Sequence, residues 1–398
     1  MKFTWHSNAP WAATGYGNQT KIFVPRLKRL GHDVAVIAFY GLEGGRIMWD
    51  DNIPIYPKGS HVYGQDILGA HSGHFGTNVT ISLLDAWVFQ PDMFQQALWI
   101  PWFPVDMDPI PPPVVRTIKR AFDRIVFSKY AQEKTQEAGL TAHYVPHGIE
   151  STIFRPRDQA AARDYLMLPK DKFVVGMVAA NKGTPSRKAF TYQLQAFAEF
   201  KKKHDDVCLY LHTNKGEHGE NQGINIPEYL DYLGLTHGML GVHKLDNTDV
   251  VFPHQYLMQF GMLDDNYMVN AYNAMDVHML VSMGEGFGIP IVEAQSCGTP
   301  VIVGDWTAMS ELCFSGWKIP KSEAHGWWTP LAAEQFVPHV EPITEALESA
   351  YRVKGNMDYR KRARKGALAY DADKVTEKYW KPVLKKIEED VQVWQPTK

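Results

Sequence analysis

The sequence predicts an α/β protein with two domains, each built on a parallel sheet. Three observations lead to this prediction. The chain has 398 residues, more than a single hydrophobic core usually serves. Residues 277–303 show the pattern of a buried strand, a glycine-rich turn, a short helix and a second strand, and residues 2–38 show the same order. Such βαβ units place their turns at the carboxyl end of the sheet, where open α/β sheets bind ligands.

Composition narrows the class of protein further. Hydrophobic residues make up 45% and charged residues 21% of the chain, as in soluble globular proteins. The net charge of −3 gives no bulk electrostatic reason to bind nucleic acid or an anionic membrane. No stretch approaches the roughly 20 apolar residues of a membrane span, and the N-terminus lacks a signal-peptide pattern, so we expect a cytoplasmic protein. The three cysteines lack metal-ligand spacing and are too few for a disulfide scaffold.

The first domain is predicted to begin with a short strand at 2–5 and a loop rich in turn formers that contains Gly15 and Gly17. A helix with apolar residues at near-helical spacing follows, and residues 34–38 form the next strand. The two glycines have two interpretations. They form a simple tight turn, or they let a ligand approach the backbone because they carry no Cβ.

Further buried strands are predicted in the first domain at 79–84 and 97–103, whereas residues 41–80 are expected to be irregular. The strand at 97–103 leads to Asp106 and Asp108 at the carboxyl edge of the sheet. Each carboxylate suits either capping of the proline-rich turn or contact with a ligand. Asp106 is favoured for the second role because it lies closer to the end of the strand.

A polar stretch at 157–170 is the predicted linker between the domains. The first domain would then comprise residues 1–156 and the second residues 171–372. The last segment, 373–398, has helical periodicity.

The second domain is predicted to open with a buried strand at 173–180, followed by a glycine- and base-rich loop and a helix. Asn181, Arg187 and Lys188 lie in this loop. Charge runs are usually solvated faces, but a helix start flanked by two cations favours an anion. We therefore predict that Arg187 and Lys188 bind phosphate.

The glycine-rich turn after residues 277–281 carries two carboxylates eight positions apart, Glu285 and Glu293. The glycines within 284–288 allow a ligand to approach the backbone, and peptide N–H groups at a helix start favour anions or sugar hydroxyls. Glu293 could instead only complement the helix dipole. The glycines and the strand before them favour a ligand site.

A resemblance to a known family becomes specific at the run EGFGIPIVEA, residues 285–294, and its continuation over 298–312. These segments resemble the donor-site signature of retaining glycosyltransferases with the GT-B fold, most closely glycosyltransferase family four. The resemblance implies two Rossmann-like domains facing a central cleft, with the acceptor on the first and the nucleotide-sugar donor on the second. It also implies that the helix within 373–398 crosses back to the first domain.

The resemblance also implies roles for single residues. Glu285 would contact hydroxyls of the transferred sugar, and Glu293 would accept hydrogen bonds from the ribose. The predicted catalytic residues are Arg187, Lys188, Glu285 and Asp106. The predicted donor-binding residues are Gly15, Gly17, Asn181, Val251, Phe252, Gly286, Phe287, Gly288 and Glu293.

The chain departs from the family pattern at two of these positions. Asp106 and Asp108 stand near the place where many members have a histidine that contacts the donor sugar. Asn181 stands roughly where an arginine is usual, so Arg187 would supply the guanidinium group. The implied role of both cations is to stabilise charge on the departing diphosphate.

The implied activity is that of a hexosyltransferase, which moves a sugar from a UDP- or GDP-sugar to an acceptor hydroxyl with retention of configuration, without a metal ion or other cofactor. The acceptor is left open as a saccharide, a lipid or a small molecule, and nucleic acid is disfavoured. The Asp106-x-Asp108 spacing keeps a metal-dependent enzyme as an alternative.

Two other functions would use the same nucleotide pocket and stay open as interpretations. The protein could be a GT-B sugar-nucleotide epimerase or a noncatalytic module that binds sugar nucleotides. An NAD-dependent dehydrogenase is disfavoured, because Gly15-Tyr16-Gly17 lacks the third glycine of the dinucleotide fingerprint.

Overall fold

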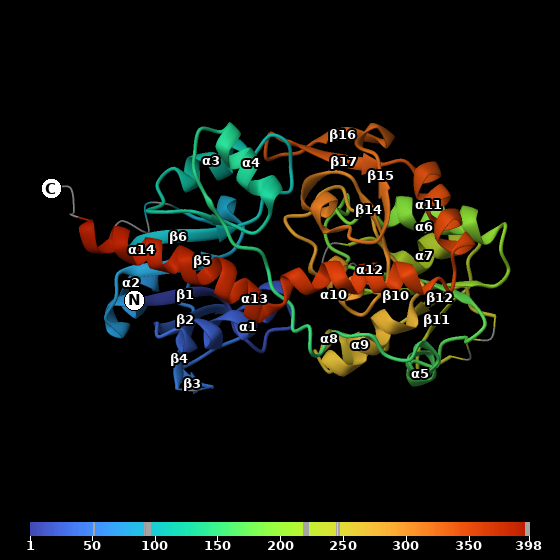
Figure 1. The fold of residues 1–398 in the computed structure, drawn as a ribbon, viewed down its shortest axis with the longest axis horizontal. Coiled ribbons are helices and arrows are strands. Elements are labelled where there is room, and N and C mark those ends of the chain that lie inside the picture. Colours follow the sequence, from blue (N-terminus) through green and yellow to red (C-terminus); the bar gives the residue numbers. More distant parts are fainter. Residues whose placement is uncertain are drawn as a thin grey trace. The chain divides into compact units, whose positions relative to one another are not determined.

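The chain folds into two α/β units, which confirms the predicted fold class (Figure 1). The computed structural model describes residues 1–50, 52–90, 92, 97–217, 223–243, 245 and 247–394. Unit 1 comprises Met1–Glu150, Thr329–Ala333 and Tyr370–Lys398. Unit 2 comprises Ser151–Trp328 and Glu334–Ala369.

Unit 1 is built on a sheet of eight strands in the order β3-β4-β2-β1-β5-β6-β7-β8. Neighbouring strands are parallel except for the β3–β4 pair. The strands are β1 Lys2–Asn8, β2 Asp33–Tyr40, β3 Ile47–Trp49, β4 Ile53–Pro57, β5 Val79–Leu83, β6 Leu98–Phe103, β7 Ile125–Val126 and β8 His143–Tyr144. The helices are α1 Gly15–Arg29, α2 Leu68–Phe75, α3 Pro112–Ile118, α4 Lys129–Glu137, α13 Ala372–Val375 and α14 Lys381–Val393, with a 3-10 turn η1 at Ala86–Val88 and a π-helical turn η7 at Thr376–Trp380.

The expectation that residues 41–80 are irregular is wrong, because β3, β4 and α2 lie within them. In β4, Ile53, Ile55 and Tyr56 are buried and the two prolines are partly exposed, so the alternation of a half-buried strand is only partly kept. The run is short and contains two prolines, so the sequence shows no clear strand period there.

The C-terminal segment of unit 1 supplies part of that unit's core. Trp380 is fully buried, and its ring centroid lies 4.9 Å from that of Trp102 and 5.6 Å from that of Trp5. Phe23 of α1 packs against the same ring at 5.8 Å. Large aromatic side chains bury much apolar area, so this cluster stabilises unit 1 around its C-terminal helices.

Unit 2 is built on a parallel sheet of seven strands in the order β11-β12-β10-β9-β13-β14-β15. The strands are β9 Phe173–Val178, β10 Val207–His212, β11 His237–Met239, β12 Val250–Phe252, β13 Val277–Leu280, β14 Val301–Gly304 and β15 Gly316–Ile319. A separate antiparallel hairpin is formed by β16 Ala324–Trp328 and β17 Glu334–Pro338. The helices are α5 Gln159–Tyr165, α6 Phe190–Lys201, α7 Ile226–Tyr232, α8 Gln255–Gln259, α9 Asp265–Ala274, α10 Ile289–Ser296, α11 Val340–Arg352 and α12 Met357–Ala367, with a 3-10 helix η4 at Thr307–Leu312.

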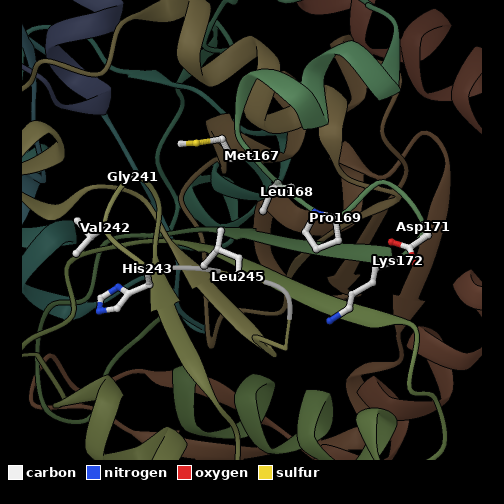
Figure 2. Close-up of a pocket in the computed structure, with 9 residues that line it drawn as sticks. All are labelled: Met167, Leu168, Pro169, Asp171, Lys172, Gly241, Val242, His243 and Leu245. Atoms are coloured by element: carbon white, nitrogen blue, oxygen red, sulfur yellow. The ribbon is translucent and has the colours of Figure 1, made fainter.

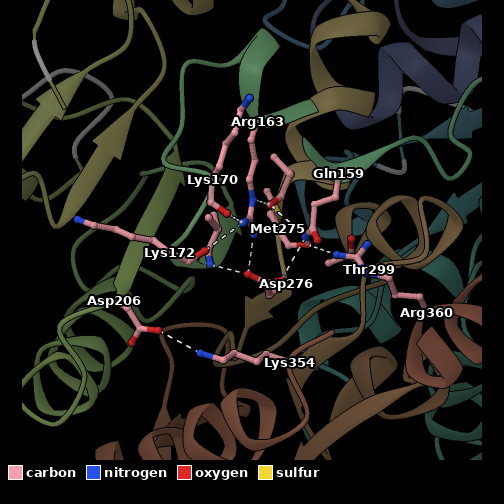
Figure 3. A network of polar contacts seen from close by, with 12 residues as sticks. Gln159, Arg163, Lys170, Lys172, Asp206, Met275, Asp276, Thr299, Lys354 and Arg360 are labelled. Carbon is pink, nitrogen blue, oxygen red and sulfur yellow. Dashed lines mark hydrogen bonds and ion pairs between the residues drawn. The ribbon is translucent and has the colours of Figure 1, made fainter. Parts of the chain in front are cut away.

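The stretch predicted as a linker, 157–170, belongs to unit 2 and contains α5. Figure 3 shows Arg163 at the centre of a polar network, where it pairs with Asp276 at 2.7 Å and donates to the carbonyl of Ala274 at 3.0 Å. The same guanidinium donates to the carbonyls of Lys170 and Lys172. Arg163 thus satisfies buried backbone carbonyls of unit 2, whereas most other polar side chains of the stretch are exposed, so composition alone could not distinguish it from a solvated linker.

In the part of the chain that the structure describes, no helix is both long enough and apolar enough to cross a lipid bilayer.

Candidate active site

Two loops meet at the carboxyl edge of the sheet of unit 2. One follows β9 and carries Arg187 and Lys188, and the other follows β13 and carries Glu285. Because β9 and β13 are neighbours in the sheet, the two loops start side by side. The backbone N–H of Met283 donates to the carbonyl of Arg187 at 2.8 Å, so the loops are also joined directly.

An ion cluster forms where these loops meet. Lys188 Nζ donates to Glu285 Oε1, and Arg187 Nη1 lies 3.3 Å from Glu285 Oε2. The Arg187 guanidinium also donates to the carbonyl of Gly284. Only 6% of the Glu285 side chain is exposed, against 16% of Lys188 and 38% of Arg187. The structure therefore brings Glu285 together with two adjacent cations that lie 97 or more positions before it in sequence.

Glu285 is held in its charged form. Burial alone would raise its pKa, but the charges of Lys188 and Arg187 lower the pKa of Glu285 to about 2. Its backbone N–H donates to Thr307 Oγ1 at 3.1 Å, and its carbonyl accepts from Ala308. The carboxylate is thus fixed in place as well as ionised. Two cations and one anion give the cluster a net positive charge.

The glycine turn ends at the first residues of α10. Gly288 has φ 106°, and a Cβ there would lie 2.8 Å from Ile291 Cδ1, so only glycine suits this position. Pro290 lies in the first helical turn, and the Phe287 ring is buried. The Gly286–Gly288 backbone consequently lies at the start of a helix, whose free N–H groups suit anions and hydroxyls.

Glu293 lies in α10 and has a partner that the sequence analysis missed. The hydroxyl of Tyr272, in α9, donates to Glu293 Oε2 at 2.8 Å. Burial raises the pKa of Glu293 to about 7, although the hydrogen bond from Tyr272 acts in the opposite direction. Tyr272 lies near the end of α9, and the periodicity of α9 and of α10 does not reveal that the two helices meet.

The hairpin β16–β17 packs against the two loops that carry the ion cluster. The backbone N–H of Phe336 donates to the carbonyl of Met283 at 2.8 Å. Val337 packs in one apolar cluster with Met283 and Ala189, and Trp327 packs against it. The sequence carries no motif at this hairpin, so this support was not predicted.

Asn181 is buried in the loop after β9. Its side-chain amide donates to the carbonyls of Ile224 at 2.7 Å and Asn214 at 3.2 Å, and its oxygen accepts from the N–H of Ile224 at 3.1 Å. These bonds fasten the loop to the segment after β10. Contact of Asn181 with a donor stays a prediction.

Val251 and Phe252 lie in β12 with their side chains in the core. Val251 pairs with Tyr210 of β10 and Gly238 of β11, and the carbonyl of Phe252 accepts from Leu240 at 2.9 Å. Contact with a nucleotide base through this backbone also stays a prediction.

In unit 1, the loop with Gly15 and Gly17 leads into α1. The hydroxyl of Thr14 caps the helix by accepting from the N–H of Gly17 at 3.0 Å. A Cβ on Gly17 would lie 2.3 Å from the carbonyl oxygen of Ala12, so the tight turn alone requires this glycine. Gly15 is exposed at the first position of the helix, where an anion or hydroxyl is favoured.

Asp106 and Asp108 follow β6 in unit 1. Asp108 Oδ1 lies 3.0 Å from Lys134 Nζ, and Asp106 and Asp108 are both partly exposed. Tyr130 fastens the loop by donating to the carbonyl of Met107 at 2.9 Å. Over the described ranges, no three His, Cys, Asp or Glu side chains are grouped closely enough to hold a metal ion.

A cavity of about 750 Å³ opens elsewhere in unit 2 (Figure 2). Its walls come from the segment before β9, including Met167 and Lys172, and from the connection between β11 and β12, including Gly241 and His243. None of the residues predicted to bind a donor lines it. The candidate active site therefore rests on the ion cluster and the start of α10.

Comparison with known proteins shows which family the segment around the candidate site resembles. Residues 172–341 match the family model described as glycosyl transferases group 1. This segment is therefore similar to the glycosyl transferases of group 1. The matched segment contains the ion cluster, Glu293 and Tyr272.

Curated relatives match part of the chain at moderate identity. A D-inositol 3-phosphate glycosyltransferase of Saccharomonospora viridis is 30% identical over 213 residues, which cover 52% of this chain and 46% of the relative. An uncharacterised glycosyltransferase 335 of Sulfolobus islandicus rod-shaped virus 1 is 28% identical over 181 residues, 44% of this chain and 45% of that protein. The chain thus spans about half the length of the curated relatives it matches.

Solved structures share the fold over nearly the whole chain. A glycosyltransferase from Rickettsia africae has a TM-score of 0.66 at 13% identity and covers 99% of both chains. Anabaena HepE in complex with UDP has a TM-score of 0.66 at 14% identity and covers 98% of this chain and 100% of its own. At such identities the likeness shows the fold alone, and that fold is GT-B.

Proposed function

We propose that the protein is a retaining glycosyltransferase that moves a sugar from a nucleoside diphosphate sugar to an acceptor hydroxyl without a metal ion. The observation that carries this proposal is the ion cluster of Arg187, Lys188 and Glu285 within the segment that resembles the group 1 glycosyl transferases. Its net positive charge, beside the start of a helix, suits a diphosphate.

Each group of the cluster has a part in the proposed transfer. The bond between the anomeric carbon and the diphosphate oxygen breaks, and the acceptor oxygen bonds to that carbon on the same face. The acceptor proton passes to an oxygen of the departing diphosphate. Arg187 and Lys188 stabilise the negative charge on that leaving group, where catalysis needs it. Glu285, ionised beside them, accepts hydrogen bonds from sugar hydroxyls.

Glu293 and Tyr272 are proposed to hold the ribose. An ionised carboxylate accepts two hydroxyl hydrogen bonds, which matches a vicinal diol. Because the pKa of Glu293 lies at about 7, diol binding also draws the carboxyl toward its ionised form. A UDP-sugar is the first donor to try, since the structural neighbour from Anabaena was solved with UDP and with UDP-glucose.

The test is incubation of the purified protein with UDP- and GDP-sugars in the presence of a chelator, followed by product analysis by NMR. The proposal predicts release of the nucleoside diphosphate and an α-linked product from an α-linked donor. A β-linked product, or activity that a chelator abolishes, would contradict the retaining or metal-independent part. An epimerised donor without acceptor would favour an epimerase, and tight donor binding without any turnover would favour a binding module.

A further inference from the structure

Three exposed aromatic side chains follow adjacent strands at the carboxyl edge of the sheet of unit 1. Tyr40 ends β2, Trp11 follows β1, and Trp87 lies in η1 after β5. Their exposed fractions are 59%, 46% and 48%. Since β1 lies between β2 and β5 in the sheet, the loops that carry these rings are neighbours.

The loops are also fastened to one another. The indole N–H of Trp11 donates to the carbonyl of Gly41 at 2.5 Å, and the N–H of Ala9 donates to the carbonyl of Tyr40 at 2.8 Å. Ala86, next to Trp87, packs in one core cluster with Val105, next to Asp106. The three rings and Asp106 therefore lie on one supported edge.

Such exposure is uncommon for rings of this size. Within the described part of unit 1, four Trp, Tyr or Phe side chains are exposed, and three of them lie at this edge. The fourth is Trp394, beyond the end of α14. Exposed apolar surface that is concentrated in one place usually marks a binding site.

Polar groups at the same edge favour a neutral ligand with hydroxyls. Asn8, the last residue of β1, is 6% exposed, and its Oδ1 has no hydrogen-bond partner among the described residues. Its Nδ2 donates to Thr14 Oγ1 at 2.6 Å. A buried acceptor without a donor is rare and calls for one. The carboxylate of Asp106 disfavours an anionic ligand by charge repulsion, whereas that of Asp108 is paired with Lys134.

We propose that this edge of unit 1 binds the acceptor and that the acceptor is a carbohydrate, with a pyranose ring against Trp11, Tyr40 and Trp87 and its hydroxyls toward Asn8 and Asp106. The C–H groups on one face of a pyranose pack against an aromatic face, while its rim needs acceptors for hydroxyl protons. An aliphatic lipid would not use the polar groups. The inference rests on the proposed transferase function.

The experiment uses three acceptor probes with UDP-glucose or the donor found active: methyl glycosides of common hexoses, the matching octyl glycosides, and myo-inositol phosphate. We expect transfer to methyl and octyl glycosides with similar kcat/KM. Trp11→Ala and Trp87→Ala should lower the ratio of transfer to donor hydrolysis about tenfold, mainly through acceptor KM. Trp11→Phe and Trp87→Phe should restore most of the loss.

Trp394→Ala is the matched control, because it removes an exposed indole of the same unit from another place, and it should leave the ratio unchanged. Transfer to octyl glycosides alone, or to inositol phosphate alone, would overturn the carbohydrate assignment. So would equal ratios for Trp11→Ala, Trp87→Ala and Trp394→Ala.

Ligand-observed NMR with methyl glycosides, in the absence of any donor, separates this inference from the proposed function. A protein that binds the glycosides through Trp11 and Trp87 but never consumes a donor would contradict the transferase proposal alone. A protein that consumes donors but shows no glycoside signal would contradict the inference alone.

Discussion

Glu285 and Glu293 belong to one ten-residue run, yet their surroundings give them opposite properties. Glu285 faces two cations, and its pKa is lowered to about 2. Glu293 faces a neutral phenol, and burial raises its pKa to about 7. Both carboxyl groups lose water, so burial does not distinguish them. The neighbouring charge decides which one is a fixed anion and which one can exchange a proton near neutral pH.

The largest expected effect comes from removing the Glu285 carboxylate. Glu285→Ala leaves Lys188 without its buried carboxylate, and loss of one partner of a buried pair costs about 3–5 kcal/mol. We expect a loss near the lower end, because Lys188 retains some access to water. Urea unfolding measures the free energy. The double variant Glu285→Ala/Lys188→Met should recover part of the loss, and a double variant no more stable than the single would contradict the pairing.

Lys188→Met tests the same cluster through activity. Loss of a charge-assisted hydrogen bond of about 1.5–3 kcal/mol to the leaving group should lower kcat roughly ten- to hundredfold. Lys202→Met is the control, since Lys202 forms an exposed pair with Glu199 in the same unit. Full activity of Lys188→Met in steady-state assays would remove the phosphate role.

The raised pKa of Glu293 predicts that the stability of the protein depends on pH. The folded-state pKa of Glu293 is raised, so the native protein binds more protons than the unfolded chain between the ordinary pKa of Glu, 4.5, and about 7. Its contribution is fully present below pH 4.5 and is lost as pH rises through about 7, with a slope of up to about 1.4 kcal/mol per pH unit. Glu293→Gln should remove this slope. Parallel curves for wild type and variant would show that Glu293 titrates normally.

The contribution of Glu285 to stability changes with pH in the opposite direction. Its folded-state pKa is lowered, so its contribution is present above the ordinary pKa of Glu, 4.5, and is lost as pH falls through about 2.

The smallest expected effect is that of Tyr272→Phe. It removes the hydroxyl that donates to Glu293 and should cost about 1 kcal/mol of unfolding free energy. It should also move the pKa of Glu293 further upward, because that hydrogen bond favours the ionised form. Titration of the Glu293 side chain by NMR checks this, and an unshifted or lowered pKa would contradict the assignment of the hydrogen bond.

Features that depend on the local order of residues along the chain could be predicted from the sequence. Strands, glycine turns and helices alternate visibly, so the two parallel-sheet units and the βαβ order around β13, α10 and β14 could be expected. Arg187, Lys188 and Glu285 could be grouped because each follows the end of a strand at the same edge. Their ion pairs could not be, since these depend on β9 and β13 being neighbours in the sheet.

What the sequence could not predict depends on contacts between elements far apart in the chain. Tyr272 meets Glu293 across two helices, and Phe336 meets Met283 through a hairpin without a motif. Arg163 binds carbonyls of its own unit in a stretch whose composition resembles a linker. In each case a polar or aromatic residue has many possible partners, and only the packed structure selects one.

Calorimetric titration of UDP and of uridine into wild type and Lys188→Met, with GDP and guanosine in parallel, tests the central claim most directly. We predict that wild type binds one diphosphate more tightly than its nucleoside. Lys188→Met should weaken the diphosphate about tenfold and leave the nucleoside affinity unchanged. A wild type that binds diphosphate no better than nucleoside, or a variant that weakens both equally, would contradict the assignment of the ion cluster to the leaving group.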